Sequence, residues 1–271
     1  MSTKKRISII GCGTIGTEVA LSIKERFSGV AQLVAVCEID AERKKIFDET
    51  LGIQVPSLTL GECVENSDLI VESANLAVVP DLLRHALLLR RDVLLMSVGG
   101  ILTEPELLEE VRAKGIKLFV PSGAIGGVDL LKSANIGKIY SVELITKKPV
   151  EALLGAPYLE EARIDLEEII GEKVIFEGKA SDAIKAFPQN VNVAATLSLA
   201  GIGPERTRVK IVTSRSLKKN IHEIAVEGDF GRAIFVIENE PSHKNPKTSQ
   251  IAAYSAISTL EKALYGIELG T

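Results

Sequence analysis

Ten residues near the N-terminus, Ile7 to Gly16, constrain the fold of this chain more than any other stretch. The apolar run Ile7–Ile10 predicts a strand that is buried on both faces. It leads into a Gly-x-Gly-x-x-Gly turn and then a helix. In such a turn Gly11 permits the tight bend, Gly13 lets a pyrophosphate approach the backbone, and Gly16 lets the helix pack closely on its strand. The free N–H groups at the helix N-terminus would bind the pyrophosphate, so this spacing is typical of dinucleotide binding.

The residues after the third glycine supply the context that a glycine pattern alone lacks. Apolar residues recur every four positions over 15–27, which predicts a helix, and Gly29 is placed to end it. A second strand over 32–37 leads to Glu38 and Asp40. An acid about 20 residues after the glycines can accept hydrogen bonds from ribose hydroxyls. We favour Glu38 because it directly ends the strand, and we favour cofactor binding over a plain βαβ unit without a ligand.

Strands and helices alternate over the first 121 residues. This alternation predicts a doubly wound parallel sheet with helices on both faces, a Rossmann-type α/β domain. Ser73–Asn75 follows the third strand at the sheet edge where ligands bind, so Ala74 joins the candidate cofactor contacts. The later strands are expected at 68–72, 92–98 and 116–121, with Gly99-Gly100 breaking the second of these, and helices at 41–50, 57–65, 80–91 and 104–114.

The sequence pattern changes from Ser122 onward. A second glycine-rich turn over 122–127 precedes segments in which apolar and polar residues alternate. That period of two predicts a smaller α+β domain with a mostly antiparallel sheet that has one exposed face. Its strands are expected at 139–147, 173–176, 208–213, 220–227 and 233–238, and its helices at 128–134 and 190–199.

These patterns divide the chain into two expected domains, as its length of 271 residues suggests. Residues 1–121 would form the dinucleotide-binding domain, completed by a C-terminal helix within 245–271 that begins near Pro246. Residues 122–244 would form the α+β domain for substrate binding, catalysis and dimerisation.

Composition excludes several classes of function. The net charge of −4 argues against a nucleic-acid or anionic-membrane surface. No apolar stretch approaches about 18 residues, and the N-terminus lacks the apolar segment of a signal peptide. Cys12, Cys37 and Cys63 are too far apart to form metal-ligand pairs, which favours buried thiols in a reducing compartment. We therefore expect a cytoplasmic protein without a metal site, nucleic-acid partner or membrane span.

Three histidines are available for proton transfer near neutral pH. His85 lies in a Leu-rich helix and is expected to be a helix-surface or packed residue. His243 is expected on a solvated loop and is a weak candidate. His222 lies on an expected strand, and its spacing leaves a solvent-facing residue as the alternative to a functional one.

The runs Pro121-Ser-Gly-Ala-Ile-Gly-Gly127 and Asn220-Ile-His-Glu223, with the first glycine turn, resemble motifs of the archaeal and bacterial L-aspartate dehydrogenases, and the resemblance runs from Ile9 nearly to the C-terminus. The most specific pieces are Pro-Ser-Gly-Ala-Ile-Gly-Gly and Asn-x-His-Glu. The resemblance implies NAD(P)-dependent oxidation of L-aspartate to iminoaspartate. That product hydrolyses to oxaloacetate and ammonia, or passes to quinolinate synthase in NAD biosynthesis. The motifs that carry it lie at 11–16, 96–100, 121–127, 190–195, 220–224 and 245–249.

The same resemblance assigns roles to particular residues. His222 matches the family's active-site histidine, whereas Ala124 and Asn190 match its cofactor contacts. Asn190 could also be an ordinary helix N-cap. The expected cofactor-binding residues are therefore Gly11, Gly13, Thr14, Ile15, Gly16, Glu38, Ala74, Ala124 and Asn190.

The sequence offers several candidate contacts for the substrate and for the cofactor. A substrate with two carboxylates needs donors, which the N–H groups of 123–127, the helix start at 190, or a cation could supply. Glu38 favours NAD, although basic residues at 43–45 could tolerate the extra phosphate of NADP. The sequence does not choose among the candidate cations Lys147, Lys148, Arg215, Lys218 and Lys219.

Other classes of protein share this layout. Homoserine dehydrogenase and dihydrodipicolinate reductase combine similar domains, and a non-catalytic dinucleotide sensor could keep the first domain and use the second to bind a partner. A homodimer is expected because a sheet with one open face can pair with its copy.

Overall fold

The computed structural model describes residues 4–188, 192–242, 248–267 and 270. The chain forms two compact units. The first unit comprises the chain up to Pro121 together with residues 252–268, and the second comprises residues 122–251 together with 269–271. Within the described ranges, no helix combines the length and apolar character needed to cross a membrane.

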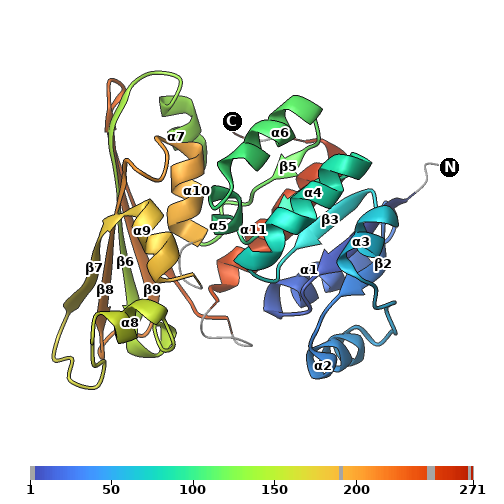
Figure 1. Cartoon of the computed structure of the whole chain (residues 1–271), viewed down its shortest axis with the longest axis horizontal. Helices are drawn as coiled ribbons and strands as arrows, with labels where there is room; N and C mark the ends of the chain where they lie inside the picture. Colours follow the sequence, from blue (N-terminus) through green and yellow to red (C-terminus); the bar gives the residue numbers. More distant parts are fainter. Residues whose placement is uncertain (1–3, 189–191, 243–247, 268–269, 271) are drawn as a thin grey trace. The chain divides into compact units, whose positions relative to one another are not determined.

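The first unit contains a five-stranded parallel sheet in the order β2-β1-β3-β4-β5 (Figure 1). The direction of winding reverses between β1 and β3, and ligands of such sheets bind at the carboxyl ends of strands beside that switch point. The predicted doubly wound parallel sheet is confirmed. Its strands are β1 (Lys5–Ile10), β2 (Ala31–Cys37), β3 (Leu69–Glu72), β4 (Asp92–Leu95) and β5 (Leu118–Phe119).

Helices cover both faces of this sheet, so β1 is buried on both sides as its apolar run predicts. Ile7 and Ile9 pack in one core cluster with residues of α1 and α11, whereas Ile10 packs in the other with residues of α3 and α4. The helices are α1 (Thr14–Glu25), α2 (Ala41–Leu51), α3 (Leu60–Glu65), α4 (Val79–Leu89), α5 (Gly99–Leu102), α6 (Pro105–Lys114) and α11 (Gln250–Tyr265), with a 3₁₀ turn η1 (Leu76–Val78).

The strand predicted at 92–98 is shorter than expected. It ends at Leu95, and Gly99-Gly100 begins the short helix α5 instead of only breaking the strand. A Cβ on Gly100 would lie 2.6 Å from the Leu76 carbonyl oxygen and from Val79 Cβ. Glycine is therefore needed there for α5 to pack against η1 and α4.

The second unit contains a five-stranded mixed sheet in the order β10-β9-β6-β8-β7. Pairing is antiparallel except between β6 and β8, which are parallel, so the prediction of a mostly antiparallel sheet is correct. The strands are β6 (Ile139–Pro149), β7 (Lys173–Lys179), β8 (Thr207–Ser214), β9 (Asn220–Gly228) and β10 (Gly231–Asn239).

Figure 1 shows α7, α9 and α10 against one face of this sheet. The other face is open, and on β10 it exposes Ile234 and Val236. Two short helices, α8 and α9, were not predicted, and Tyr158 and Phe187 join them to Phe176 of β7 in an aromatic cluster. The helices are α7 (Val128–Ala134), α8 (Pro157–Glu161), α9 (Ala180–Ala186) and α10 (Asn192–Ala200), with a 3₁₀ turn η2 (Val150–Ala152).

Candidate active site

The three glycines of the first turn have different surroundings at the carboxyl end of β1. Gly11 has a φ of +95°, and a Cβ there would lie 2.8 Å from Ala74 Cα. A Cβ on Gly16 would lie 2.1 Å from the carbonyl oxygen of Gly11. Around Gly13, by contrast, an added Cβ would meet no described atom within 4 Å. Protein packing therefore explains Gly11 and Gly16, but it gives no reason for a glycine at position 13.

The open space beside Gly13 lies at the N-terminus of α1. Gly13 is the N-cap residue, and among the described residues no side chain caps this helix end. The first turn also contains no acidic residue, so its N–H groups, those of Thr14, Ile15 and Gly16 among them, keep their partial positive charge. Such a helix end can bind an anion, and a bare glycine lets that anion approach the backbone. The turn therefore fits the pyrophosphate of a dinucleotide.

Glu38 and Asp40 occupy different places at the end of β2. Glu38 accepts hydrogen bonds from the backbone N–H of Cys12 at 2.8 Å and from that of Asp40 at 2.9 Å. Asp40 is instead the N-cap of α2 and accepts from Glu42 and Arg43 N–H. The Glu38 carboxylate thus lies against the first glycine turn, and each of its oxygens keeps lone-pair capacity for a ribose hydroxyl.

Glu72 ends β3 and was not singled out from the sequence. Its buried carboxylate accepts from the Ala74 N–H at 2.8 Å, the Ser97 N–H at 2.8 Å and the Ser97 hydroxyl at 2.9 Å. Burial raises the pKa of this carboxyl. Glu72 therefore joins the loops that follow β3 and β4. The Ala74 N–H donates to Glu72, and the backbone of Ala74 lies beside Gly11.

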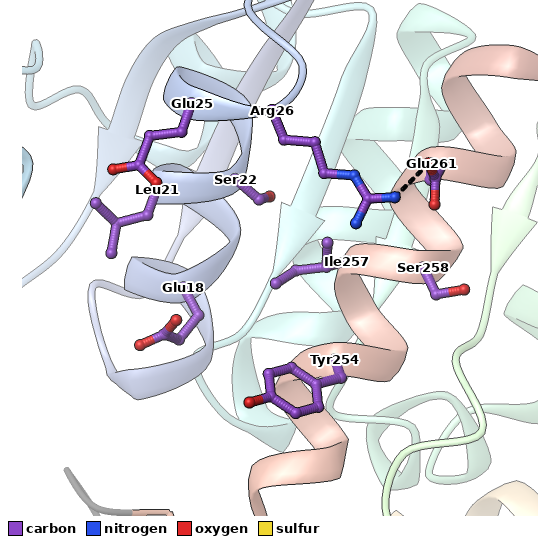
Figure 2. A pocket seen from close by; sticks show the side chains of 9 residues that line it. All are labelled: Glu18, Leu21, Ser22, Glu25, Arg26, Tyr254, Ile257, Ser258 and Glu261. Carbon is purple, nitrogen blue, oxygen red and sulfur yellow. Dashed lines mark hydrogen bonds and ion pairs between the residues drawn. The ribbon is translucent and has the colours of Figure 1, made fainter.

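A separate groove of about 540 Å³ lies between α1 and α11. Figure 2 shows Arg26 and Glu261 bridging it through an ion pair of 2.6 Å. Its α1 residues, Glu18 to Glu25, come from the helix beyond its first turn, so the groove is distinct from the glycine turn.

His222 lies on the covered face of the second sheet and is only 2% exposed. The alternative of a solvent-facing strand residue is therefore wrong. Its Nδ1 lies 2.8 Å from the hydroxyl of Thr146, which is its partner across the β6–β9 ladder. Burial, and then the positive charge of Lys148, lower the pKa of His222 to about 3. The imidazole is therefore neutral near neutral pH.

Lys148 differs in burial from the other candidate cations. It follows Thr146 by two residues on β6, on the same face, and burial lowers its pKa to about 8. Lys147 and Lys219 form ion pairs with Glu223 and Glu240. Arg215 bonds the carbonyl of Glu167, and Lys218 is exposed. The covered sheet face thus combines a neutral imidazole with a buried ammonium group.

The second glycine turn is attached to this same unit through β10. The carboxamide of Asn239 donates to the Ala124 carbonyl at 2.9 Å. A Cβ on Gly127, whose φ is +80°, would lie 2.5 Å from the ring of Phe235. Both contacts hold the turn against the strand next to β9, which carries His222.

The remaining candidates do not belong to either cluster. His85 is exposed on α4, with its Nδ1 2.8 Å from the Asp81 carbonyl oxygen. Asn190 and His243 lie outside the described residues. No group of three His, Cys, Asp or Glu side chains in the described part of the chain could hold a metal ion.

An open helix N-terminus at the switch point of one sheet and a buried neutral imidazole on another are compatible with one class of enzyme, the dehydrogenases that use a nicotinamide dinucleotide. Comparison with known families supports it. Residues 11–121 match the family model described as "Homoserine dehydrogenase, NAD binding domain", and residues 129–263 match "Aspartate dehydrogenase, C-terminal".

Individual relatives show which family of dehydrogenases this chain resembles. An L-aspartate dehydrogenase of Methanosarcina barkeri is 43% identical, over 98% of this chain and 99% of its own length. An L-aspartate dehydrogenase of Bradyrhizobium diazoefficiens is 37% identical, over 100% of this chain and 95% of its own length. The crystal structure of aspartate dehydrogenase from Thermotoga maritima shares the fold, with a TM-score of 0.74 at 24% identity, over 99% of this chain and 100% of that one. The chain belongs to the L-aspartate dehydrogenase family.

The surroundings of the glycines predict that alanine at position 13 weakens cofactor binding, whereas alanine at position 16 lowers the stability of the fold. Gly13→Ala should change the free energy of unfolding by less than about 1 kcal/mol, because the new methyl group meets open space. It should weaken NADH binding about tenfold or more, because the methyl group stands where the pyrophosphate would lie. Gly16→Ala should instead cost roughly 3 kcal/mol or more, because its methyl group would overlap the Gly11 carbonyl. Urea unfolding and NADH fluorescence titration measure the two effects, and unchanged NADH affinity in Gly13→Ala would contradict this account.

Proposed function

We propose that this protein catalyses the NAD(P)-dependent oxidative deamination of L-aspartate to iminoaspartate, which water converts to oxaloacetate and ammonia. The observation that carries the proposal is the pairing of a neutral His222 with a buried Lys148 on one sheet face, in a chain of this family. A dicarboxylate needs positive charge, and a substrate ammonium needs a base. Both are present on that face.

Binding of the substrate would itself change the pKa of His222. The pKa of His222 is low because the ring is buried and because Lys148 repels a second positive charge. A carboxylate bound beside Lys148 would offset that repulsion and raise the pKa of His222 toward the working pH. His222 would then take a proton from the substrate ammonium, as a general base does most effectively when its pKa lies near the ambient pH.

The nucleotide contacts are proposed from the first unit and from the family motifs. The turn from Gly11 to Gly16, with Thr14 and Ile15 in the first helical turn, would hold the pyrophosphate, and Glu38 the ribose. Ala74 would leave room at the switch point. Ala124 and Asn190 are proposed as cofactor contacts from their motifs alone. When bound, the nicotinamide supplies the hydride acceptor for the α-carbon of aspartate.

The assembly and cellular role are also proposals. The open sheet face with exposed Ile234 and Val236 supports a homodimer formed through β10. Free thiols at Cys12, Cys37 and Cys63 suit the reducing cytoplasm. The hand-off of iminoaspartate to quinolinate synthase for NAD biosynthesis follows from the family resemblance.

Turnover with L-aspartate tests the proposed function. Purified protein with NAD or NADP at alkaline pH should reduce the nicotinamide in the presence of L-aspartate, but not with homoserine. His222→Ala should lose about 100-fold or more in kcat, because the general base is gone, while it retains NADH affinity. His85→Ala, which changes a histidine on the surface of α4, is the matched control and should keep full activity.

Two results would contradict the proposal. Preference for homoserine would favour the homoserine dehydrogenase alternative, and tight NADH binding without turnover of any amino acid would favour a dinucleotide sensor.

Cofactor choice depends on Glu38 in this proposal, with NAD preferred and NADP tolerated. Glu38→Ser should raise the ratio of NADP to NAD activity about tenfold or more, because it removes the ribose acceptor and its negative charge beside a 2′-phosphate. The ratio of kcat/KM for the two cofactors measures this shift. Asp40→Ser is the control, since Asp40 caps α2, and it should leave the ratio unchanged. An unchanged ratio in Glu38→Ser would show that another residue selects the cofactor.

A further inference from the structure

Asn220 is a buried polar residue with an unused acceptor. Its side chain is 2% exposed at the start of β9, and its Oδ1 has no hydrogen-bond partner in the described part of the chain. Native proteins rarely leave a buried polar atom in this condition, because the atom loses water without gaining a partner. An unpaired acceptor in a candidate site indicates a ligand group that donates a hydrogen bond.

The position of Asn220 places this acceptor within the polar sheet face already described. Asn220 precedes His222 by two residues, so both side chains lie on the same face of β9. The β6–β9 ladder ends with the pair Lys147 and Ile221, and one further step brings Lys148 opposite Asn220. Across the other edge of β9, Asn220 pairs with Asn239. The acceptor is therefore flanked by a base and a cation.

Asn239 shows how the two asparagines differ. Its carboxamide donates to the Ala124 carbonyl and so holds the second glycine turn. Asn220 has no such contact for its Oδ1. The Asn239 carboxamide has a structural role, whereas Asn220 Oδ1 is buried without a hydrogen-bond partner in the described part of the chain.

In an amino dicarboxylate, only the amino group can donate a hydrogen bond to the Oδ1 of Asn220. Ionised carboxylates accept hydrogen bonds but cannot donate them, whereas an ammonium group donates three and a neutral amine still donates. We propose that Asn220 Oδ1 accepts a hydrogen bond from the amino group of the substrate, beside His222, and so selects amino acids over dicarboxylates that lack this group. This inference rests on the proposed function and adds the residue that recognises the reacting nitrogen.

The contact would persist through the loss of the first proton. Because the amine formed after proton transfer to His222 still carries N–H groups, Asn220 could hold the nitrogen while the hydride leaves the adjacent carbon. Lys148, which lies across from Asn220 on β6, would attract a carboxylate. The order of Lys148, Asn220 and His222 on the sheet would therefore orient the substrate.

Binding of two ligands that differ in the amino group tests this assignment. L-aspartate and succinate are titrated calorimetrically into the NADH-bound protein, in which aspartate cannot be oxidised. Asn220→Ala should weaken L-aspartate binding about tenfold and change succinate binding less than about twofold. Asn239→Ala, which loosens the second glycine turn, is the matched control and should weaken both ligands alike. Equal weakening of both ligands in Asn220→Ala would overturn the assignment.

A second variant keeps the test decisive if Asn220→Ala does not fold. Asn220→Asp preserves shape and an acceptor oxygen, so it should retain L-aspartate binding within about threefold and weaken succinate more strongly through its added negative charge. Equal weakening of the two ligands would again overturn the assignment. Turnover of L-aspartate by the unchanged protein separates the two proposals. If the unchanged protein oxidises L-aspartate and the variant binds both ligands equally weakly, only the role of Asn220 is rejected. If the unchanged protein does not oxidise L-aspartate, the proposed function is rejected.

Discussion

The covered face of the second sheet buries the ammonium group of Lys148 together with the imidazole of His222. Burial lowers the pKa of Lys148 from 10.5 to about 8, which corresponds to about 3 kcal/mol of destabilisation at every pH below 8, where both folded and unfolded chains carry the proton. This cost disappears as pH rises from 8 through 10.5. His222, whose pKa falls to about 3, reduces stability only as pH falls below 6.5. The burial of these two groups thus reduces the stability of the folded chain, a pattern that is common at functional sites.

The first unit also offers positive charge for an anion, but through backbone N–H groups at the N-terminus of α1 instead of a side chain. At the carboxyl end of this sheet, two carboxylates accept hydrogen bonds from backbone N–H groups of the loops. Glu38 binds the N–H of Cys12 in the glycine turn, and Glu72 joins the loops after β3 and β4. These bonds hold the loops around the N-terminus of α1, while Gly13 leaves the approach open. The loops around the helix N-terminus are thus held by hydrogen bonds, and the space beside Gly13 is left free for a dinucleotide.

The sequence predicted features that depend on local pattern. The β1 strand, the glycine turn and the fold of both sheets follow from periodicity and glycine spacing, whereas α8 and α9 are too short to show a helical period. The face of His222 could not be predicted, because β9 carries apolar residues on both faces, Ile221 on one and Ile224 on the other. Lys148 could not be distinguished from its neighbours because burial depends on tertiary packing. Asn220 and Glu72 could have been noticed as polar residues at the ends of apolar strands.

Proton uptake on ligand binding tests the central claim, that Lys148 and its neighbours form the dicarboxylate site. Succinate is titrated calorimetrically at pH 8 in buffers of different ionisation enthalpy. A carboxylate beside Lys148 would raise the pKa of Lys148, so at pH 8 and saturating succinate the protein should take up about half a proton, and Lys148→Met should take up much less. Succinate binding without proton uptake near pH 8 would contradict the account and place the substrate elsewhere.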